Sequence, residues 1–223
     1  MTLTKYGWKQ WLCITVVLSF PFFISIYLDW WIGVAAVVAL WLVLVSFFRN
    51  PRRRIPSGLE NGTMLSPADG TISAIERADH HKAIGGEALV IRVFLSVLNV
   101  HINRAPCDCT LKEMVYTPGK FLDARTAESA QLNESNLLIF DNNGEAFGVR
   151  QVSGKIARHI ICPLEVDDTL RQGQQFGMIK YGSTTELILP RPEDVDLRVK
   201  VGDKVKAGLT TFCVLKTSPA SMP

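Results

Sequence analysis

The chain has 223 residues, 48% of them hydrophobic, and a formal net charge of +3; this length allows one good-sized domain and an appendage. So small a net charge gives no reason to expect nucleic acid as a partner. The five cysteines are odd in number and irregularly spaced, and no second Cys or His pair accompanies Cys107 and Cys109, so neither a disulfide framework nor a metal site is predicted.

Two long apolar runs open the chain, from Trp11 to Leu28 and from Trp30 to Phe48, with Asp29 between them. Each is about as long as a helix that crosses a hydrocarbon core, roughly 17–25 residues. Residues 1–50 are therefore predicted to form a membrane-anchoring helical hairpin that turns near Asp29. A hairpin buried in the core and a re-entrant loop are the alternatives, whereas a cleaved signal peptide fits worse because two runs occur.

Basic residues flank this hairpin on both sides, at Lys5, Lys9, Arg49, Arg52, Arg53 and Arg54. By the positive-inside rule, both ends lie in the cytoplasm. The prediction is a protein of the cytoplasmic membrane whose remaining residues, 51–223, form a domain on the cytoplasmic side. The arginine cluster is expected at the membrane edge, where it either contacts anionic phospholipid head groups or only sets the topology.

After Pro56 the pattern changes to short β-type runs separated by glycine and proline. The predicted strands are Thr71–Ile75, Ala88–Leu95, Thr110–Val115, Leu137–Phe140, Ala146–Gln151, Ile156–Ile161, Gln175–Ile179, Thr185–Leu189 and Thr210–Leu215. Asn142-Asn143-Gly144 is a hairpin signal between two of them. Only Asp123–Ala130 and Pro163–Arg171 are predicted to be helical, and both are short. The expected fold class is mainly β, a barrel or sandwich with minor helices, preceded by the hydrophobic helical hairpin.

Two glycine-centred segments of this domain look alike, Ser66–Ile72 and Val201–Gly208. The second resembles the turns of lipoyl- and biotin-carrier barrels, in which glycine allows a tight reversal. Those carriers modify a lysine in a Met-Lys context at a hairpin tip, and the nearest lysine here, Lys180, lacks that context. Carrier-domain-like turns without a swinging-arm cofactor are therefore predicted.

The dipeptide Gly182-Ser183 carries the strongest chemical signal in the chain. Glycine leaves its carbonyl open to attack and tolerates a distorted backbone. The Ser183 hydroxyl can attack this carbonyl in an N→O acyl shift, and elimination would then cut the chain. Ser183 would become a pyruvoyl group, a ketone cofactor made from the protein itself. Taken alone, however, a Gly-Ser pair is more often a turn.

Two further stretches accompany this pair in a fixed order, Leu65–Ile72 and Phe94–Pro106. Together the three segments make the chain, from about residue 50 to about residue 215, resemble the phosphatidylserine decarboxylase family, in particular its short, pyruvoyl-dependent members. The resemblance implies a proenzyme that cleaves itself at Gly182-Ser183 into residues 1–182, the β chain, and residues 183–223, the α chain.

The resemblance also implies the reaction and its partners. The pyruvoyl group would bind the amine of the serine head group as a Schiff base and release CO2, which gives phosphatidylethanolamine in phospholipid biosynthesis. The implied partners are a phospholipid substrate and the membrane, with the two cleavage products held as a heterodimer and possible further pairing into a homodimer. A pyruvoyl group from Ser183 is the only cofactor implied, and no metal is expected.

The self-cut needs a base, and His101 is the best candidate because histidine titrates near neutrality. Asp69 could orient its ring in the manner of the carboxylate of a catalytic triad. The alternative for His101 is a half-buried structural histidine whose hydrogen bonds are satisfied. The alternative for Asp69 is an ordinary Asp-Gly turn.

The chain departs from the family pattern at two positions, which are also the candidate substrate-binding residues. Many members have an aspartate where this chain has Asn99, which cannot act as a base. Larger members have a second histidine where this chain, like short members, has Arg104. The Arg104 fork matches a substrate carboxylate or phosphate, and a surface salt bridge is the alternative. Which residue orients His101 stays open. Asn133-Glu134 resembles an Asn-Glu pair of the family, which makes Glu134 a weaker candidate for an acid behind the site, and His159 is a weaker candidate for lining it.

Two other classes of function remain alternatives. The first is a membrane-anchored serine hydrolase that uses Ser183, His101 and Asp69 without cleavage, although the Gly-x-Ser-x-Gly elbow is missing. The second is a non-catalytic, carrier-like β barrel that binds a partner. Within the decarboxylase hypothesis, an archaeal-type ether lipid is also open as the substrate because the serine head group is shared.

Overall fold

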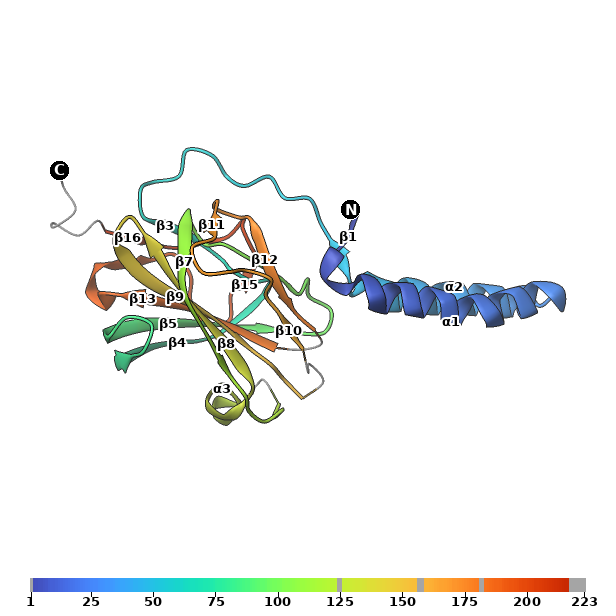
Figure 1. Cartoon of the computed structure of the whole chain (residues 1–223). Coiled ribbons are helices and arrows are strands. Elements are labelled where there is room, and N and C mark those ends of the chain that lie inside the picture. The colour runs from blue at the N-terminus through green and yellow to red at the C-terminus, as the bar shows by residue number, and fades with distance from the viewer. Residues whose placement is uncertain (1, 124–125, 156–158, 181–182, 217–223) are drawn as a thin grey trace. The chain divides into compact units, whose positions relative to one another are not determined.

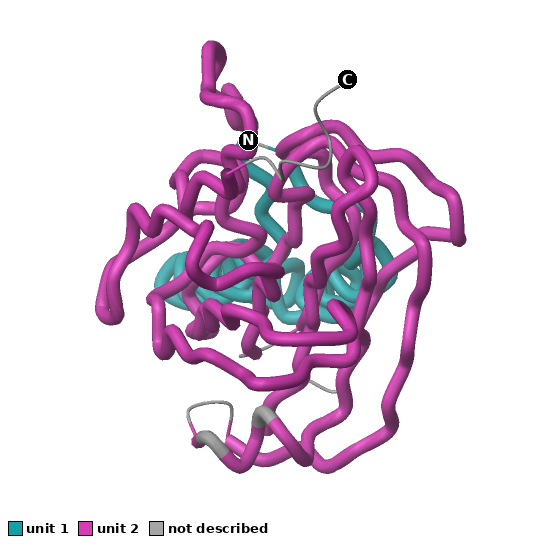
Figure 2. The backbone as a smooth tube through the Cα atoms, turned by 90° about the vertical axis from the view of Figure 1, so that its left-hand side faces the viewer, with its two compact units in different colours: residues 1–52 teal, residues 53–223 magenta. Residues whose placement is uncertain are grey.

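The computed structural model describes residues 2–123, 126–155, 159–180 and 183–216. The chain divides into two compact units, residues 1–52 and residues 53–223 (Figure 2).

The first unit is an antiparallel pair of apolar helices, α1 (Trp8–Tyr27) and α2 (Trp31–Ser46) (Figure 1). The chain reverses at Asp29, whose φ of 51° is left-handed. Short strands β1 (Thr2–Leu3) and β2 (Arg49–Asn50) pair at the open end of the hairpin. The helix α1 is long and apolar enough to cross a membrane by length and composition, and α2 is shorter. The predicted helical hairpin is therefore confirmed as a fold.

The second unit is built from three sheets and one short helix, α3 (Ala127–Leu132). The largest sheet has eight strands in the order β11 (Thr169–Leu170), β7 (Cys109–Thr117), β8 (Ser135–Asn142), β9 (Glu145–Val152), β13 (Ser183–Pro190), β5 (Gly86–Leu95), β4 (Gly70–His81) and β15 (Lys204–Val205). The smaller sheets are β10 (Ile160–Ile161), β12 (Gln175–Ile179) and β6 (Ile102–Arg104), and β14 (Val195–Leu197), β16 (Thr211–Leu215) and β3 (Thr63–Leu65).

Alternation along the strands gives the large sheet two apolar faces. Leu187 and Leu189 of β13 pack in the main core, whereas Ile188 packs in a smaller cluster on the opposite face. Phe176 of β12 and Phe212 of β16 also pack in the main core. The face that carries Leu187, here called the inner face, is therefore the one that the two smaller sheets cover.

The predicted fold class, mainly β, is confirmed, and the sheets are open rather than closed into a barrel within the described residues. The Asn-Gly hairpin is also confirmed, with Asn143 and Gly144 at φ 53° and 87° between β8 and β9. The predicted helix over Pro163–Arg171 is wrong. A turn there leads into β11, whose two residues pair with Cys109 and Thr110 of β7 and so satisfy their backbone groups in a ladder.

The two glycine-centred segments lie side by side in the fold. Lys204 and Val205 of β15 pair with Thr71 and Gly70 at the start of β4. Close by, the Gly208 N–H donates to the Ser66 carbonyl at 2.9 Å. The two similar segments thus lie side by side, and their likeness to carrier-domain turns stays a prediction.

A tight approach at Gly177 yields a stability prediction. A Cβ at this position would lie 2.6 Å from the Ile161 carbonyl oxygen and 2.9 Å from Gln151 Nε2. Because backbone cannot move aside cheaply, Gly177→Ala should lower the free energy of unfolding by about 2 kcal/mol. Thermal unfolding of the solubilised protein measures this loss. Gly86→Ala is the matched strand control, since no atom lies within 4 Å of its Cβ position, and equal stability of the two variants would contradict the prediction.

Candidate active site

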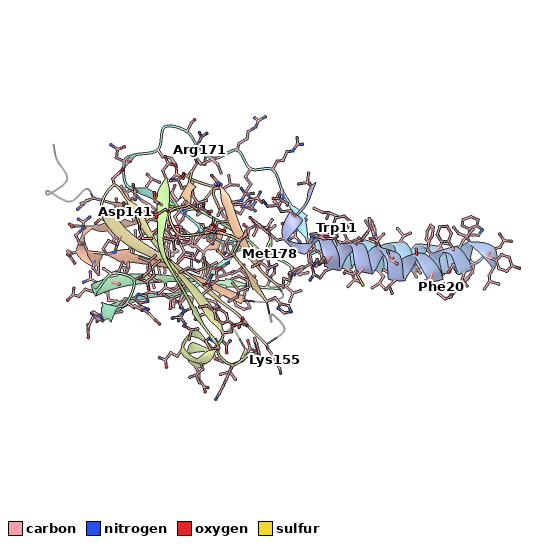
Figure 3. The ribbon with its side chains drawn as sticks, viewed as in Figure 1. Trp11, Phe20, Asp141, Lys155, Arg171 and Met178 are labelled. Carbon is pink, nitrogen blue, oxygen red and sulfur yellow. The ribbon has the colours of Figure 1, made fainter. Side chains whose placement is uncertain are left out.

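Ser183 begins β13 and lies in a row of residues that crosses the sheet. It pairs with Leu95 of β5 on one side. On the other side Thr184 pairs with Val152, so the antiparallel register sets Ser153 opposite Ser183. The Ser153 N–H in turn donates to the Glu134 carbonyl at 2.9 Å. We call Glu134, Ser153 and Ser183 the serine row. Figure 3 labels Asp141, which lies near the β8–β9 hairpin, and Lys155, which follows the other end of β9.

The next row on the inner face is made of buried amide and hydroxyl side chains. Asn136, Gln151 and Thr185 occupy it in register on β8, β9 and β13. Asn136 Nδ2 donates to Gln151 Oε1 at 3.3 Å, and Gln151 Nε2 donates to Asn103 Oδ1 at 2.9 Å. Asn103, on β6 of the covering sheet, donates from Nδ2 to Thr185 Oγ1 at 3.0 Å. We call Asn136, Gln151 and Thr185 the amide row, and Asn103 ties the covering sheet to it.

Chain geometry directs the His101 side chain toward the serine row. On the extended segment through β6, residues two apart face the same way, so His101, Asn103 and Ala105 share a face. Ala105 packs in the main core and Asn103 binds the amide row. His101, the next residue on this face, therefore lies on the side of the amide row that is away from the main core. A short turn connects His101 back to Leu95, which itself pairs with Ser183. The His101 side chain is fully buried.

The hydrogen bond of the His101 ring fixes its tautomer. Nδ1 lies 2.9 Å from the Asn99 carbonyl oxygen. Because a carbonyl oxygen only accepts, Nδ1 carries the hydrogen in the neutral ring. Nε2 is then the nitrogen that can accept a proton, which is the property a general base needs.

The serine row contains buried polar atoms without partners. Within the described residues, Ser183 Oγ, Ser153 Oγ and Glu134 Oε2 have no hydrogen-bond partner, nor has Asn136 Oδ1 in the amide row. The other Glu134 oxygen accepts from the Tyr116 hydroxyl at 2.8 Å, and this bond raises the pKa of Tyr116. A nucleophile that is not committed to another hydrogen bond is available for attack, so this feature suits a reactive Ser183.

Asp69 makes hydrogen bonds away from His101. Its carboxylate accepts from the Arg53 guanidinium at 2.7 Å and from the Ala207 N–H at 2.8 Å. Among the described residues no hydrogen bond joins Asp69 to His101, and the Asn99 carbonyl holds the ring instead. Arg53, predicted at the membrane edge with the other arginines, is buried in this ion pair.

The two candidate substrate-binding residues also have structural contacts. Arg104 is buried, and its guanidinium donates to the Gly173 carbonyl at 2.9 Å. The Asn99 side chain accepts from both the N–H and the hydroxyl of Ser96, which closes the turn before His101. His159 is exposed. Gly182, the other half of the predicted cleavage site, lies outside the described residues.

Lys180, three residues before Ser183, is a buried cation. Its N–H donates to the His159 carbonyl, but its ammonium has no hydrogen-bond or ion-pair partner in the part of the chain that the structure describes. Desolvation by burial lowers the pKa of Lys180 from its usual value of 10.5. A base whose folded pKa lies below the unfolded one reduces stability at neutral pH. This loss diminishes as the pH rises through the folded pKa toward 10.5.

Lys180→Met should therefore stabilise the protein at pH 7. We expect the midpoint of thermal unfolding to rise by about 2–4 °C, the shift that roughly 1 kcal/mol causes in a chain of this size. Scanning calorimetry of the solubilised protein tests this, with the exposed Lys155→Met as control. A lower midpoint for Lys180→Met would show that the ammonium is stabilised in the folded protein.

The sequence had pointed to Ser183 and His101, and it missed Asn103, Asn136, Gln151 and Ser153. One signal was present. Asn136 is two residues from Leu138, and Gln151 is two residues from Val149, so each pair shares a face of its strand. Because Leu138 and Val149 lie in the main core, Asn136 and Gln151 are polar residues at core-facing positions. Such residues need partners inside the protein, and this requirement marks them for a site.

The structure therefore offers a buried serine whose hydroxyl has no hydrogen-bond partner among the described residues, in a mainly β unit that follows an apolar helix pair along the chain. Comparison with known proteins identifies the family. The family model described as phosphatidylserine decarboxylase matches residues 40–213. The chain belongs to the phosphatidylserine decarboxylase family, as the resemblance predicted.

Individual relatives agree with this assignment. A protein of Desulfotalea psychrophila is 44% identical over 165 residues, which cover 74% of this chain and 75% of the relative. One of Rhodopirellula baltica is 41% identical over 186 residues, covering 82% and 76%. One of Geotalea uraniireducens is 40% identical over 203 residues, covering 91% and 90%. All three are named phosphatidylserine decarboxylase proenzyme.

Proposed function

We propose that this chain is a proenzyme that cuts itself between Gly182 and Ser183 and then decarboxylates the serine head group of phosphatidylserine. The observation that carries the proposal is the Ser183 hydroxyl, which is fully buried and has no hydrogen-bond partner among the described residues. The names of the relatives support both the lipid and the need for processing. No comparison favours a serine hydrolase or a non-catalytic barrel.

The proposed self-cut uses the Ser183 hydroxyl, the Gly182 carbonyl and the His101 ring. The Ser183 hydroxyl attacks the Gly182 carbonyl, and the amide becomes an ester as the nitrogen takes the hydroxyl proton. His101 Nε2 then removes the α-proton of residue 183, and the bond between Cβ and Oγ of that residue breaks. This leaves a carboxylate on Gly182 and an enamine at residue 183, and water converts the enamine to a ketone with loss of ammonia.

The pyruvoyl group formed in this way supplies an electron sink for the carbon that loses CO2. The residues of the chain have three remaining tasks. The buried rows keep water away from that carbon, because every side chain of the amide row is buried. His101 can return a proton to the carbon after CO2 leaves. The donors and acceptors of the serine row are available to hold the head group.

The two products of the cut are expected to stay together as a heterodimer. Residues 183–190 form β13, which pairs along its whole length with β5 and over five positions with β9. Farther along, β16 pairs with β3 and β14. A central strand with neighbours on both sides cannot leave without exposing its buried residues to water. Further pairing into a homodimer belongs to the proposal through the family resemblance alone.

Membrane attachment is the last element of the proposal. The apolar hairpin, with α1 long enough to cross a bilayer, supports an anchor in the cytoplasmic membrane. The basic residues on both flanks support a cytoplasmic β unit. An anchored enzyme meets a lipid head group without extracting the acyl chains from the bilayer. This arrangement fits a phospholipid substrate.

Intact mass measurement of the purified protein tests the proposal. We expect a fragment of residues 183–223 with a blocked N-terminus, a second fragment of residues 1–182, and release of CO2 from phosphatidylserine. Borohydride reduction in the presence of the lipid should attach the head-group amine to the small fragment. A single full-length species that keeps serine at position 183 and still releases CO2 would overturn the proposal.

A further inference from the structure

Four of the buried polar atoms without a partner in the described residues lie in two neighbouring rows of one sheet face. They are Ser183 Oγ, Ser153 Oγ, Glu134 Oε2 and Asn136 Oδ1. Folded proteins pair nearly all buried polar atoms, so a group of unpaired ones calls for a ligand or bound water. Ser183 itself is consumed in the proposed self-cut. The other three have no role in that reaction.

The orientation of the Asn136 amide follows from the network behind it. Asn103 Nδ2 donates to Thr185 Oγ1 and faces the Pro67 carbonyl, which can only accept. Asn103 Oδ1 is therefore the acceptor for Gln151 Nε2, and Gln151 Oε1 is the acceptor for Asn136 Nδ2. This chain of bonds leaves Asn136 Oδ1 as the atom that is open to a ligand.

The open atoms differ in what they can bind. Glu134 Oε2, as a carboxylate oxygen, and Asn136 Oδ1 only accept hydrogen bonds, whereas the Ser153 hydroxyl can also donate. Two acceptors beside one donor suit a ligand with both an ammonium and a carboxylate. Adjacent strands lie about 4.8 Å apart, and successive residues on one face about 7 Å apart, so an amino acid head group fits among them.

We propose that Glu134, Asn136 and Ser153 form the subsite for the amino-acid end of the substrate head group. Glu134 and Asn136 bind its ammonium, and Ser153 donates to its carboxylate. The Tyr116 hydroxyl holds the other Glu134 oxygen and so fixes the direction of the carboxylate. This assignment rests on the proposed decarboxylation.

The product offers a way to test the two halves of the subsite separately. Phosphatidylethanolamine keeps the amine and lacks the carboxylate. In mixed micelles, Glu134→Gln should raise the KM for phosphatidylserine and weaken inhibition by phosphatidylethanolamine, each by about 10-fold. Ser153→Ala should raise the KM by about 10-fold and leave inhibition by phosphatidylethanolamine unchanged. A role in folding alone would not separate the two lipids in this way.

The controls and a second variant keep the result decisive. Glu165→Gln and Ser73→Ala make the same substitutions at exposed positions and should match the unaltered protein. Intact mass shows whether each variant has cut itself, and all constants refer to the cut fraction. If Glu134→Gln does not mature, Glu134→Asp replaces it, because this variant keeps the charge but shortens the side chain. We expect the same higher KM for phosphatidylserine and the same weaker inhibition by phosphatidylethanolamine.

The outcomes distinguish this subsite from the proposed function. An unaltered protein that stays uncut, or releases no CO2, refutes the function itself. A cut and active protein whose matured Glu134 and Ser153 variants keep the original KM and the original product inhibition overturns the subsite and leaves the function standing. If Ser153→Ala weakens the binding of phosphatidylserine and of phosphatidylethanolamine equally, the assignment of the carboxylate to Ser153 is also overturned.

Discussion

Ser183→Ala is expected to remain a single chain and to release no CO2 from phosphatidylserine. Without the hydroxyl, no ester forms at the Gly182 carbonyl, so neither the cut nor the ketone can follow. The variant should fold normally, since the Ser183 hydroxyl has no hydrogen-bond partner among the described residues and its loss leaves no other group unpaired. Denaturing electrophoresis or intact mass shows the uncut chain, a CO2-release assay measures activity, and thermal unfolding measures folding.

The combination of normal folding and complete loss of activity makes this variant informative. Its free energy of unfolding should lie within about 1 kcal/mol of that of the uncut proenzyme, because only a small buried hydroxyl is removed. Ser73→Ala, at an exposed position on β4, is the control and should cut itself and turn over substrate. Activity in an uncut Ser183→Ala protein would rule out a cofactor made from this residue.

The sequence alone predicted those parts of the fold that depend on local signals. Two uninterrupted apolar runs were enough for the helical hairpin, and the reversal fell at Asp29 as expected. Long alternating runs predicted strands such as β5 and β9, and the Asn-Gly pair predicted the turn after β8. Each of these signals lies within a single stretch of chain, so no knowledge of distant partners was needed.

Short strands could not be predicted in this way. β6 and β11 have three and two residues, too few to show an alternating pattern, and they exist because distant strands supply their hydrogen bonds. The wrong helix at Pro163–Arg171 has the same cause, since pairing with β7 outweighed the local preference.

The candidate site shows a similar division. Ser183 was visible because its chemistry needs only the residue before it. The carboxylate of Asp69 was a plausible partner for His101 by residue type, but Arg53 and the Ala207 N–H lie close to it in space and bind it. Ser153 comes opposite Ser183, and Asn136 comes into the neighbouring row, only through the register of three strands. Register depends on the whole sheet, and a single sequence does not state it.

His101→Ala should accumulate as uncut proenzyme, with the rate of self-cleavage reduced by about 100-fold or more, the usual contribution of a general base. In the neutral ring the hydrogen lies on Nδ1, toward the Asn99 carbonyl, which leaves Nε2 as the nitrogen that can accept a proton. A pulse-chase measurement of the two fragments gives the rate.

Added imidazole separates a chemical role for His101 from a structural one. The small cavity left by His101→Ala lies in a buried site, where free imidazole can take the place of the missing ring and should restore part of the cleavage rate. It should not affect His80→Ala, whose exposed side chain lies on β4 and whose cleavage should be normal. If His101→Ala cuts itself at the original rate, another group must remove the proton. If instead Asp69→Asn slows cleavage as much as His101→Ala does, the Asp69 carboxylate supports the ring in the reacting state, although the resting protein binds it to Arg53.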